Sequence, residues 1–143
     1  FQMKRTQKMV MSGYLASMGF GLPGAMAAAL AYSDRQIVCI AGDGGFSMVM
    51  ADFLTVLKYQ MPVKVFVLNN QSLGMIKQEQ KVEGYQVWQT ELYNPNFADY
   101  AELLGGIGIK VTEPDELAVA VDKALSTKKP VIVDIETDPR RFI

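Results

Sequence analysis

The sequence contains no histidine and a single cysteine, Cys39. The absence of histidine excludes histidine-based catalytic triads, histidine-ligated zinc and histidine general bases within this chain. One cysteine cannot form an intrachain disulfide, and we therefore expect the reducing cytoplasm as the compartment of the protein. Chemistry must then rely on carboxylates, amides, backbone groups, or a cofactor that brings its own reactive atoms.

The sequence also lacks a charge surplus and a long hydrophobic run. Fourteen Lys and Arg residues stand against 15 Asp and Glu residues, which gives no basic excess for nucleic acid or an anionic membrane surface. Residues 4–33 resemble a secretory signal, but four glycines and a proline interrupt the apolar stretch. Its longest unbroken run is far below the ~20 residues of a membrane span. We expect a soluble protein without a transmembrane segment or a nucleic-acid partner.

Short apolar runs alternate with segments of helical character along the 143 residues. Four runs are typical of buried strands, at 36–41, 63–68, 107–111 and 131–135. Helices are expected at 25–31, 46–59, 73–80, 96–104 and 114–126, with a tight turn at 42–45 and a long irregular loop at 83–95. The alternation predicts a single α/β domain over residues 1–143, built on an open parallel sheet with helices on both faces.

A glycine-rich segment offers one interpretation of the ligand. Residues 19–24 fit the pattern G-x-G-x-x-G, and Asp43 follows Gly24 after 19 residues, close to the dinucleotide-binding fingerprint. The fingerprint requires a strand before its first glycine, whereas residues 10–18 contain Gly13 and two serines. A nucleotide-binding or assembly module without catalytic activity is an alternative function of another class.

Polar residues at two successive strand ends offer a second interpretation. Asp43, Gly44 and Gly45 follow the strand at 36–41, and Asn70 follows the strand at 63–68. Ligands of open α/β sheets bind beyond the carboxyl ends of strands, so these residues can face one crevice. Glycine N–H groups at a helix start suit phosphate, and carboxylate and amide oxygens suit Mg²⁺. The pattern predicts a metal–diphosphate site; a helix cap and an ordinary turn are the alternative.

The spacing of Gly42-Asp43-Gly44 and Asn69-Asn70 resembles the signature of thiamine-diphosphate-dependent enzymes. Residues 16–25 resemble the aminopyrimidine-contacting segment of the pyruvate oxidase and acetolactate synthase group. Residues 73–80 and parts of 84–98 resemble pyruvate oxidases and pyruvate dehydrogenase (quinone). The resemblance covers about residues 5–137 and implies the C-terminal pyrophosphate-binding domain of the pyruvate oxidase branch. Acetolactate synthase or a related 2-keto-acid decarboxylase is the alternative.

The resemblance also implies how this chain would bind the cofactor. Mg²⁺ would be held by Asp43, Asn70 and the backbone carbonyl of Ser72. The carbonyl of Ala16 would accept a hydrogen bond from the 4′-amino group, and Met18 would force the cofactor to bend, unless it is an ordinary core methionine. The complete cofactor-binding set implied by the resemblance is Ala16, Met18, Gly42, Asp43, Gly44, Gly45, Asn70, Ser72, Leu73 and Gly74.

Catalytic roles near the reacting carbon are implied for Met75, Ile76 and Glu79, although Glu79 fits a solvated charged face equally well. The implied activity is oxidative decarboxylation of pyruvate, with electrons passing to FAD on a domain outside this chain. Family members are several times longer and take an essential glutamate from a pyrimidine-binding domain. We therefore expect a fragment without the first strand of its domain, inactive alone and working in a homo-oligomer. Peripheral attachment of the intact enzyme to a membrane is left open.

Overall fold

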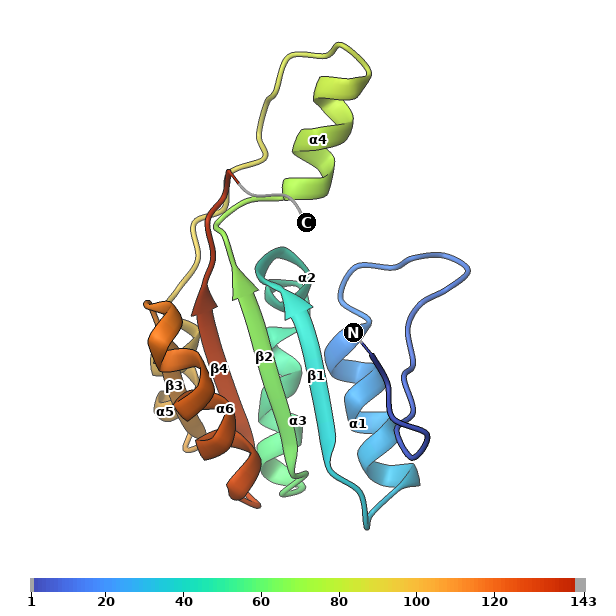
Figure 1. Ribbon diagram of the computed structural model, residues 1–143, viewed down its shortest axis with the longest axis vertical. Coiled ribbons are helices and arrows are strands. Elements are labelled where there is room, and N and C mark those ends of the chain that lie inside the picture. Colours follow the sequence, from blue (N-terminus) through green and yellow to red (C-terminus); the bar gives the residue numbers. More distant parts are fainter. Residues whose placement is uncertain (1, 141–143) are drawn as a thin grey trace.

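Four parallel strands form the centre of the structure, a computed structural model that describes residues 2–140 (Figure 1). The strands are β1 (Ile37–Gly42), β2 (Val63–Asn69), β3 (Ile107–Val111) and β4 (Val131–Glu136), in the spatial order β1-β2-β4-β3. In the registers of β1 with β2 and of β2 with β4, Cys39 lies opposite Val65, which in turn lies opposite Ile132. The predicted open parallel α/β sheet is confirmed.

Helices cover the two faces of the sheet unequally. The helices are α1 (Gly21–Ala31), α2 (Asp43–Ser47), α3 (Phe53–Lys58), α4 (Gly74–Val82), α5 (Phe97–Leu103) and α6 (Leu117–Ser126), with 3-10 turns η1 (Met50–Asp52) and η2 (Pro114–Glu116). Side chains of α1, α2, α3 and α5 form one core cluster with alternate residues of β1 and β2. On the opposite face α6 packs on β3 and β4, in one core cluster that also includes Phe66 of β2, and α4 stands beyond the strand ends (Figure 1).

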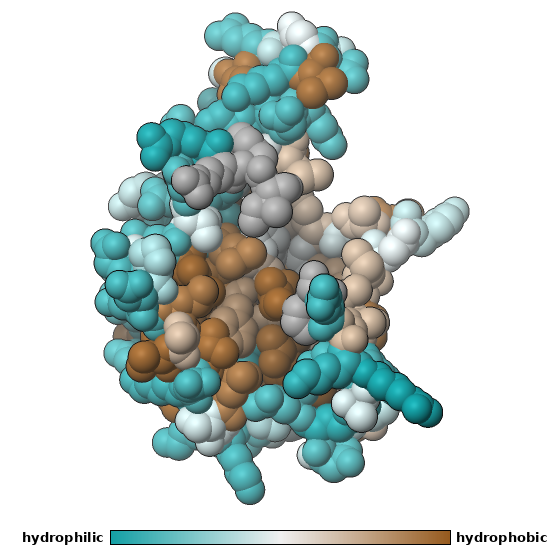
Figure 2. Space-filling view, viewed as in Figure 1, coloured by the Kyte–Doolittle hydropathy of each residue, from teal (hydrophilic) through white to brown (hydrophobic). Residues whose placement is uncertain are grey.

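The face that α6 leaves open carries apolar side chains of β1 and β2. Val38 and Ile40 are 46% and 64% exposed, and Leu68 is exposed beside them. Figure 2 shows apolar residues gathered over the middle of this face. Lys64 lies on the same side of β2 but is buried, and its Nζ donates to the Lys129 carbonyl at 2.6 Å. Burial lowers the pKa of Lys64.

Helix α5 approaches β3 so closely that only glycine fits at Gly108. A Cβ atom at this position would lie 2.0 Å from the carbonyl oxygen of Ala98, a backbone atom that cannot move without displacing the helix. The start of α5 is also fixed by its cap, because the Asn96 side chain accepts from the N–H groups of Ala98 and Asp99. Asn96 is thus the N-cap of α5 and fixes the position of the chain that enters the helix.

The segment after β1 differs from the prediction. The tight turn expected at 42–45 is wrong, because α2 begins at Asp43 directly after the last strand residue, Gly42. The continuous helix expected at 46–59 is also wrong: it is divided into the end of α2, η1 and α3. The Ser47 hydroxyl donates to the Asp43 carbonyl, and Val49 leaves the helical region with φ −129°. Two glycines within α2 weaken its propensity to continue.

Other boundaries shift less. Helix α1 begins at Gly21, four residues before the predicted start, which places Pro23 in the first turn, where its missing N–H is harmless. Residues 83–95 form the expected irregular loop, apart from one bridge between Ser72 and Glu91. Within residues 2–140, the helices are all too short or too polar to cross a membrane.

Candidate functional site

The first part of the site is the junction of β1 and α2, where Asp43 is 2% exposed. Its carboxylate accepts a hydrogen bond from Nδ2 of Asn94 at 2.7 Å. Because the strand passes into the helix without a loop, Asp43 lies at the carboxyl end of β1, at the edge of the sheet where ligands of parallel α/β folds bind. The structure therefore places Asp43 at this edge, and its role as a metal ligand stays a prediction.

The second part is the end of β2, where Asn69 and Asn70 have different roles. The Asn69 side chain is buried, donates to Asp134 Oδ1 at 3.0 Å and accepts from Nδ2 of Asn94 at 3.0 Å. The Asn70 side chain accepts from the Ser72 N–H at 3.0 Å, and Gln71 between them has φ +54°. Asn70 thus forms an ordinary turn, which was the alternative to a metal site in the sequence. Its side-chain oxygen also lies at the strand end where a cation ligand is predicted.

Residues 90–92 pair with the loop that follows β2. The carbonyl of Thr90 accepts from the Leu73 N–H at 2.7 Å and from the Ser72 hydroxyl at 3.2 Å, and the Leu92 N–H donates to the Gln71 carbonyl at 2.9 Å. Residues 90–92 belong to the stretch that resembles pyruvate dehydrogenase (quinone), but their contact with the loop after β2 could not be predicted, because the stretch has no periodicity. The contacts make it part of the wall of the site.

Three apolar side chains converge over Gly44 in the first turn of α2. A Cβ atom on Gly44 would lie 2.6 Å from Leu73 Cδ2 and 3.4 Å from both Leu92 Cδ1 and Met18 Cε. These three side chains form the Gly44 cluster. Met18 comes from the segment before α1, so the structure brings this predicted residue to the helix start that carries Asp43 and Gly44. A larger residue here would have to displace the end of the Leu73 side chain.

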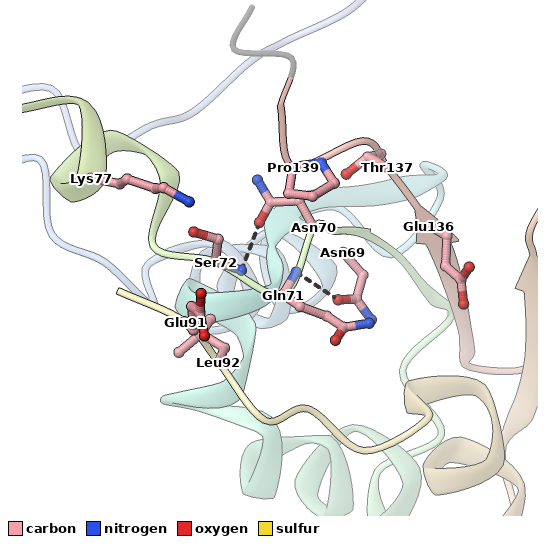
Figure 3. A pocket seen from close by; sticks show the side chains of 10 residues that line it. All are labelled: Asn69, Asn70, Gln71, Ser72, Lys77, Glu91, Leu92, Glu136, Thr137 and Pro139. Atoms are coloured by element: carbon pink, nitrogen blue, oxygen red, sulfur yellow. Dashed lines mark hydrogen bonds between the residues drawn. The ribbon is translucent and has the colours of Figure 1, made fainter. Parts of the chain in front are cut away.

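A pocket of about 460 Å³ opens beyond the ends of β2 and β4 (Figure 3). It is lined by Asn69, Asn70, Gln71, Ser72, Lys77, Glu91, Leu92, Glu136, Thr137 and Pro139. Two predicted site residues, Asn70 and Ser72, are therefore brought into one pocket. The lining also includes Lys77, which points in from α4 and was not predicted.

The structure does not bring the predicted catalytic residues into that pocket. Met75, Ile76 and Glu79 lie on α4, which stands beyond the sheet, and Met75 is 76% exposed (Figure 1). Ala16 is exposed as well, with a left-handed backbone at φ +48°. Their catalytic and cofactor-binding roles stay predictions.

An ion pair between the partly exposed Lys110 and the buried Asp134 supports the site from the side of β4. Asp134 is fully buried and accepts from Lys110 Nζ at 3.0 Å and from the Phe97 N–H at 3.1 Å, and Lys110 also contacts Glu136 at 2.9 Å. Burial by itself would lower the pKa of Lys110, but its bonds to Glu136 and Asp134 outweigh this and raise it. The pair fixes the end of β4 next to Asn69.

The donor atoms fit a magnesium ion shared with a diphosphate. Asp43 offers a carboxylate, Asn70 an amide oxygen and Ser72 a backbone carbonyl, all hard oxygen ligands. Within residues 2–140, no group of three or more His, Cys, Asp or Glu residues could hold a metal by itself. A set with one carboxylate therefore needs further oxygens from a bound anion, and Gly44 and Gly45 follow Asp43 in the first turn of α2, where backbone N–H groups suit phosphate.

Comparison with known proteins identifies the class to which this fold and site belong. Residues 1–135 match the family model of the thiamine pyrophosphate enzyme, C-terminal TPP binding domain. The chain belongs to this family, as its resemblance predicted.

Several curated proteins are similar to this chain. YdaP of Bacillus subtilis (strain 168), whose name describes it as thiamine pyrophosphate-containing, is 49% identical over 135 residues, 94% of this chain and 24% of YdaP. The acetolactate synthase large subunit of Haemophilus influenzae is 40% identical over 137 residues, 92% of this chain and 24% of that protein. The acetolactate synthase isozyme 2 large subunit of Escherichia coli (strain K12) is 36% identical over 138 residues, 94% of this chain and 25% of that protein. The chain spans about a quarter of the length of these relatives.

Proposed function

We propose that this chain is the diphosphate- and Mg²⁺-binding domain of a thiamine-diphosphate-dependent enzyme that converts pyruvate to acetolactate. The observation that supports the cofactor role is the buried Asp43 at the end of β1, directly before Gly44 and under the Gly44 cluster. The acetolactate activity is supported by the relatives that carry this name at 40% and 36% identity. The names of these relatives favour acetolactate synthase, given above as the alternative, over the pyruvate oxidase branch.

The residues of this chain would bind and orient the cofactor. Asp43, Asn70 and the Ser72 carbonyl would coordinate Mg²⁺, and the N–H groups of Gly44 and Gly45 would donate to the diphosphate. When bound, thiamine diphosphate supplies the carbon nucleophile and takes up the electron pair that is released as CO₂ leaves. This division of labour suits a chain without histidine.

Further contacts belong to the same proposal. Met18 would press against the cofactor from above Gly44, and the Ala16 carbonyl would accept from its amino group. The positions of Gly42, Leu73 and Gly74 next to the metal ligands support the remaining cofactor contacts. On α4, the exposed Met75, Ile76 and Glu79 would meet the substrate once the other parts of the enzyme enclose the helix.

Oxidation of pyruvate, with FAD on another domain as the electron carrier, is a second candidate. It is supported by the resemblance of parts of residues 84–98 to pyruvate dehydrogenase (quinone), and by the contacts of residues 90–92 with the loop after β2. In addition, YdaP, at 49% identity, is not named an acetolactate synthase. The segment that distinguishes the two candidates therefore forms part of the site wall.

The proposal includes partners that this chain does not contain. The uncovered apolar face of β1 and β2 supports packing against further domains or subunits of the same enzyme, in a homo-oligomer. The lone, buried Cys39 suits a cytoplasmic location.

Product analysis tests the proposal in the complete enzyme. With pyruvate, Mg²⁺ and thiamine diphosphate, we expect CO₂ release and acetolactate in the absence of any electron acceptor. Acetate or acetyl phosphate formed only when an acceptor is supplied would contradict this and favour the oxidase. CO₂ release that is independent of thiamine diphosphate would contradict both candidates.

A further inference from the structure

A continuous chain of polar side chains connects the proposed metal ligand to the opposite edge of the site. Nδ2 of Asn94 donates to Asp43 Oδ2 at 2.7 Å and to Asn69 Oδ1 at 3.0 Å. Asn69 in turn donates to Asp134 Oδ1 at 3.0 Å, and Asp134 accepts from Lys110. Asn94 is thus the only one of these residues that lies outside the sheet and α2, in the irregular loop before α5.

The two carboxylates determine the orientation of both amides. A carboxylate only accepts hydrogen bonds, so the NH₂ end of Asn94 must face Asp43 and the NH₂ end of Asn69 must face Asp134. The oxygen of Asn69 then faces Asn94, whose NH₂ group has one hydrogen for each of its two acceptors. The chain has a single self-consistent arrangement, and Asn94 cannot turn over without losing both bonds.

From this geometry we infer that Asn94 is a positioning residue for the Mg²⁺ site, an inference that rests on the proposed function. Its bond to one carboxylate oxygen of Asp43 fixes the plane of the carboxylate and leaves the other oxygen to be directed at the ion. Its bond to Asn69 ties this orientation to the end of β2, from which Asn70 and Ser72 follow. Asn94 therefore sets the distance between ligands contributed by β1 and by the loop after β2.

The neighbouring contacts explain why the loop can hold Asn94 in place. Leu92 is bonded through its N–H to the Gln71 carbonyl, and its side chain lies in the Gly44 cluster. On the other side, Asn96 caps α5 and the Phe97 N–H donates to Asp134. Asn94 is anchored two residues before and two residues after its own position, so its amide is held in place before any ion binds.

The test uses Mn²⁺ as a paramagnetic substitute for Mg²⁺ in the complete enzyme saturated with thiamine diphosphate. Bound and free Mn²⁺ are distinguished by electron paramagnetic resonance, which reports ion affinity without turnover. Asn94→Leu keeps the size of the side chain and removes both donors, and we expect the Kd for Mn²⁺ to rise about tenfold or more, as for a lost bond to a charged group. Activity should be restored by raising Mg²⁺, with kcat within about twofold of the wild type.

Two further variants separate positioning from folding. Asn94→Ala removes the same donors without bulk, and we expect the same rise in Kd. Tyr100→Phe removes the hydrogen bond that the Tyr100 hydroxyl of α5 donates to the Met50 carbonyl, and we expect lower thermal stability with an unchanged Kd for Mn²⁺. Wild-type affinity in both Asn94 variants, or an equal rise in Tyr100→Phe, would overturn the inference alone. If the wild type binds no Mn²⁺ in a thiamine-diphosphate-dependent manner, the proposed function fails as well.

Discussion

Gly44 shows at the scale of a single residue how tightly the site is built. Its missing side chain leaves space that the Gly44 cluster fills, with Leu73 Cδ2 at 2.6 Å from the position of a Cβ atom. The contact is with the flexible end of a side chain, so a larger residue would displace Leu73 without unfolding the helix. Gly44 thereby couples the start of α2 to the loop after β2.

We predict that Gly44→Ala weakens thiamine diphosphate binding to the complete enzyme by about tenfold, because the added methyl group overpacks the cluster by roughly 1–3 kcal/mol. Isothermal titration calorimetry in the presence of Mg²⁺ measures the effect. Gly13→Ala is the matched control, because a Cβ atom at Gly13 has nothing within 4 Å. Equal affinity of Gly44→Ala and the wild type would refute a close approach of the cofactor at this position.

Single residues also show where prediction from sequence succeeds and where it fails. The positions of Asp43 and Asn70 at the strand ends could be predicted because each lies two residues after an apolar run, and parallel strands place their ends at one edge. Asn94 could not be predicted, because its partners Asp43 and Asn69 are 51 and 25 residues away and its loop has no periodicity. Only the folded chain brings its amide to them.

At the scale of elements, β1 and α1 enclose Cys39. The thiol is buried, and its sulfur lies 3.1 Å from the position that a Cβ atom on Gly21 would take. Burial raises the pKa of the thiol from 9.0 to about 11, because the thiolate would lose its hydration between strand and helix. The folded protein therefore holds this proton more tightly than the unfolded chain.

The sign of this shift predicts the alkaline stability of the chain. Burial of the protonated Cys39 thiol contributes about 2 kcal/mol to the free energy of unfolding. This contribution is fully present below pH 9 and is lost as the pH rises toward 11. We expect the wild type to lose this much more stability than Cys39→Ala between pH 8 and pH 11. Urea unfolding at each pH measures the difference, because other titrating groups are common to both proteins. If the unfolding free energies of the two proteins fall equally between pH 8 and pH 11, burial does not disfavour the Cys39 thiolate.

Strands were easier to predict than helix boundaries for a physical reason. The central strand β2 has a strand neighbour on each side and is buried at all but one of its residues, so its sequence is apolar apart from Lys64 and Asn69. The helix after β1 depends on local competition: glycines weaken it, and the Ser47 hydroxyl bonds to the Asp43 carbonyl. Periodicity alone shows neither effect, so the break at residues 48–49 was missed.

At the scale of the whole molecule, the sheet separates a well-covered face from an open one. Four helices cover one face, whereas α6 leaves Val38, Ile40 and Leu68 exposed on the other (Figure 2). The ligand edge lies at the strand ends between these faces, with α4 standing above it (Figure 1). Within residues 2–140 this layout leaves the ligand edge and the apolar face of β1 and β2 uncovered, and the chain spans about a quarter of the length of the relatives it matches.

The central claim is that this chain binds thiamine diphosphate through a magnesium ion held at Asp43. The most direct measurement is calorimetric titration of the complete enzyme with thiamine diphosphate, with and without Mg²⁺, for the wild type, Asp43→Ala and the exposed control Asp52→Ala. We predict Mg²⁺-dependent binding for the wild type and Asp52→Ala, and an affinity at least about tenfold lower for Asp43→Ala. Unchanged, Mg²⁺-dependent affinity in Asp43→Ala would contradict the account.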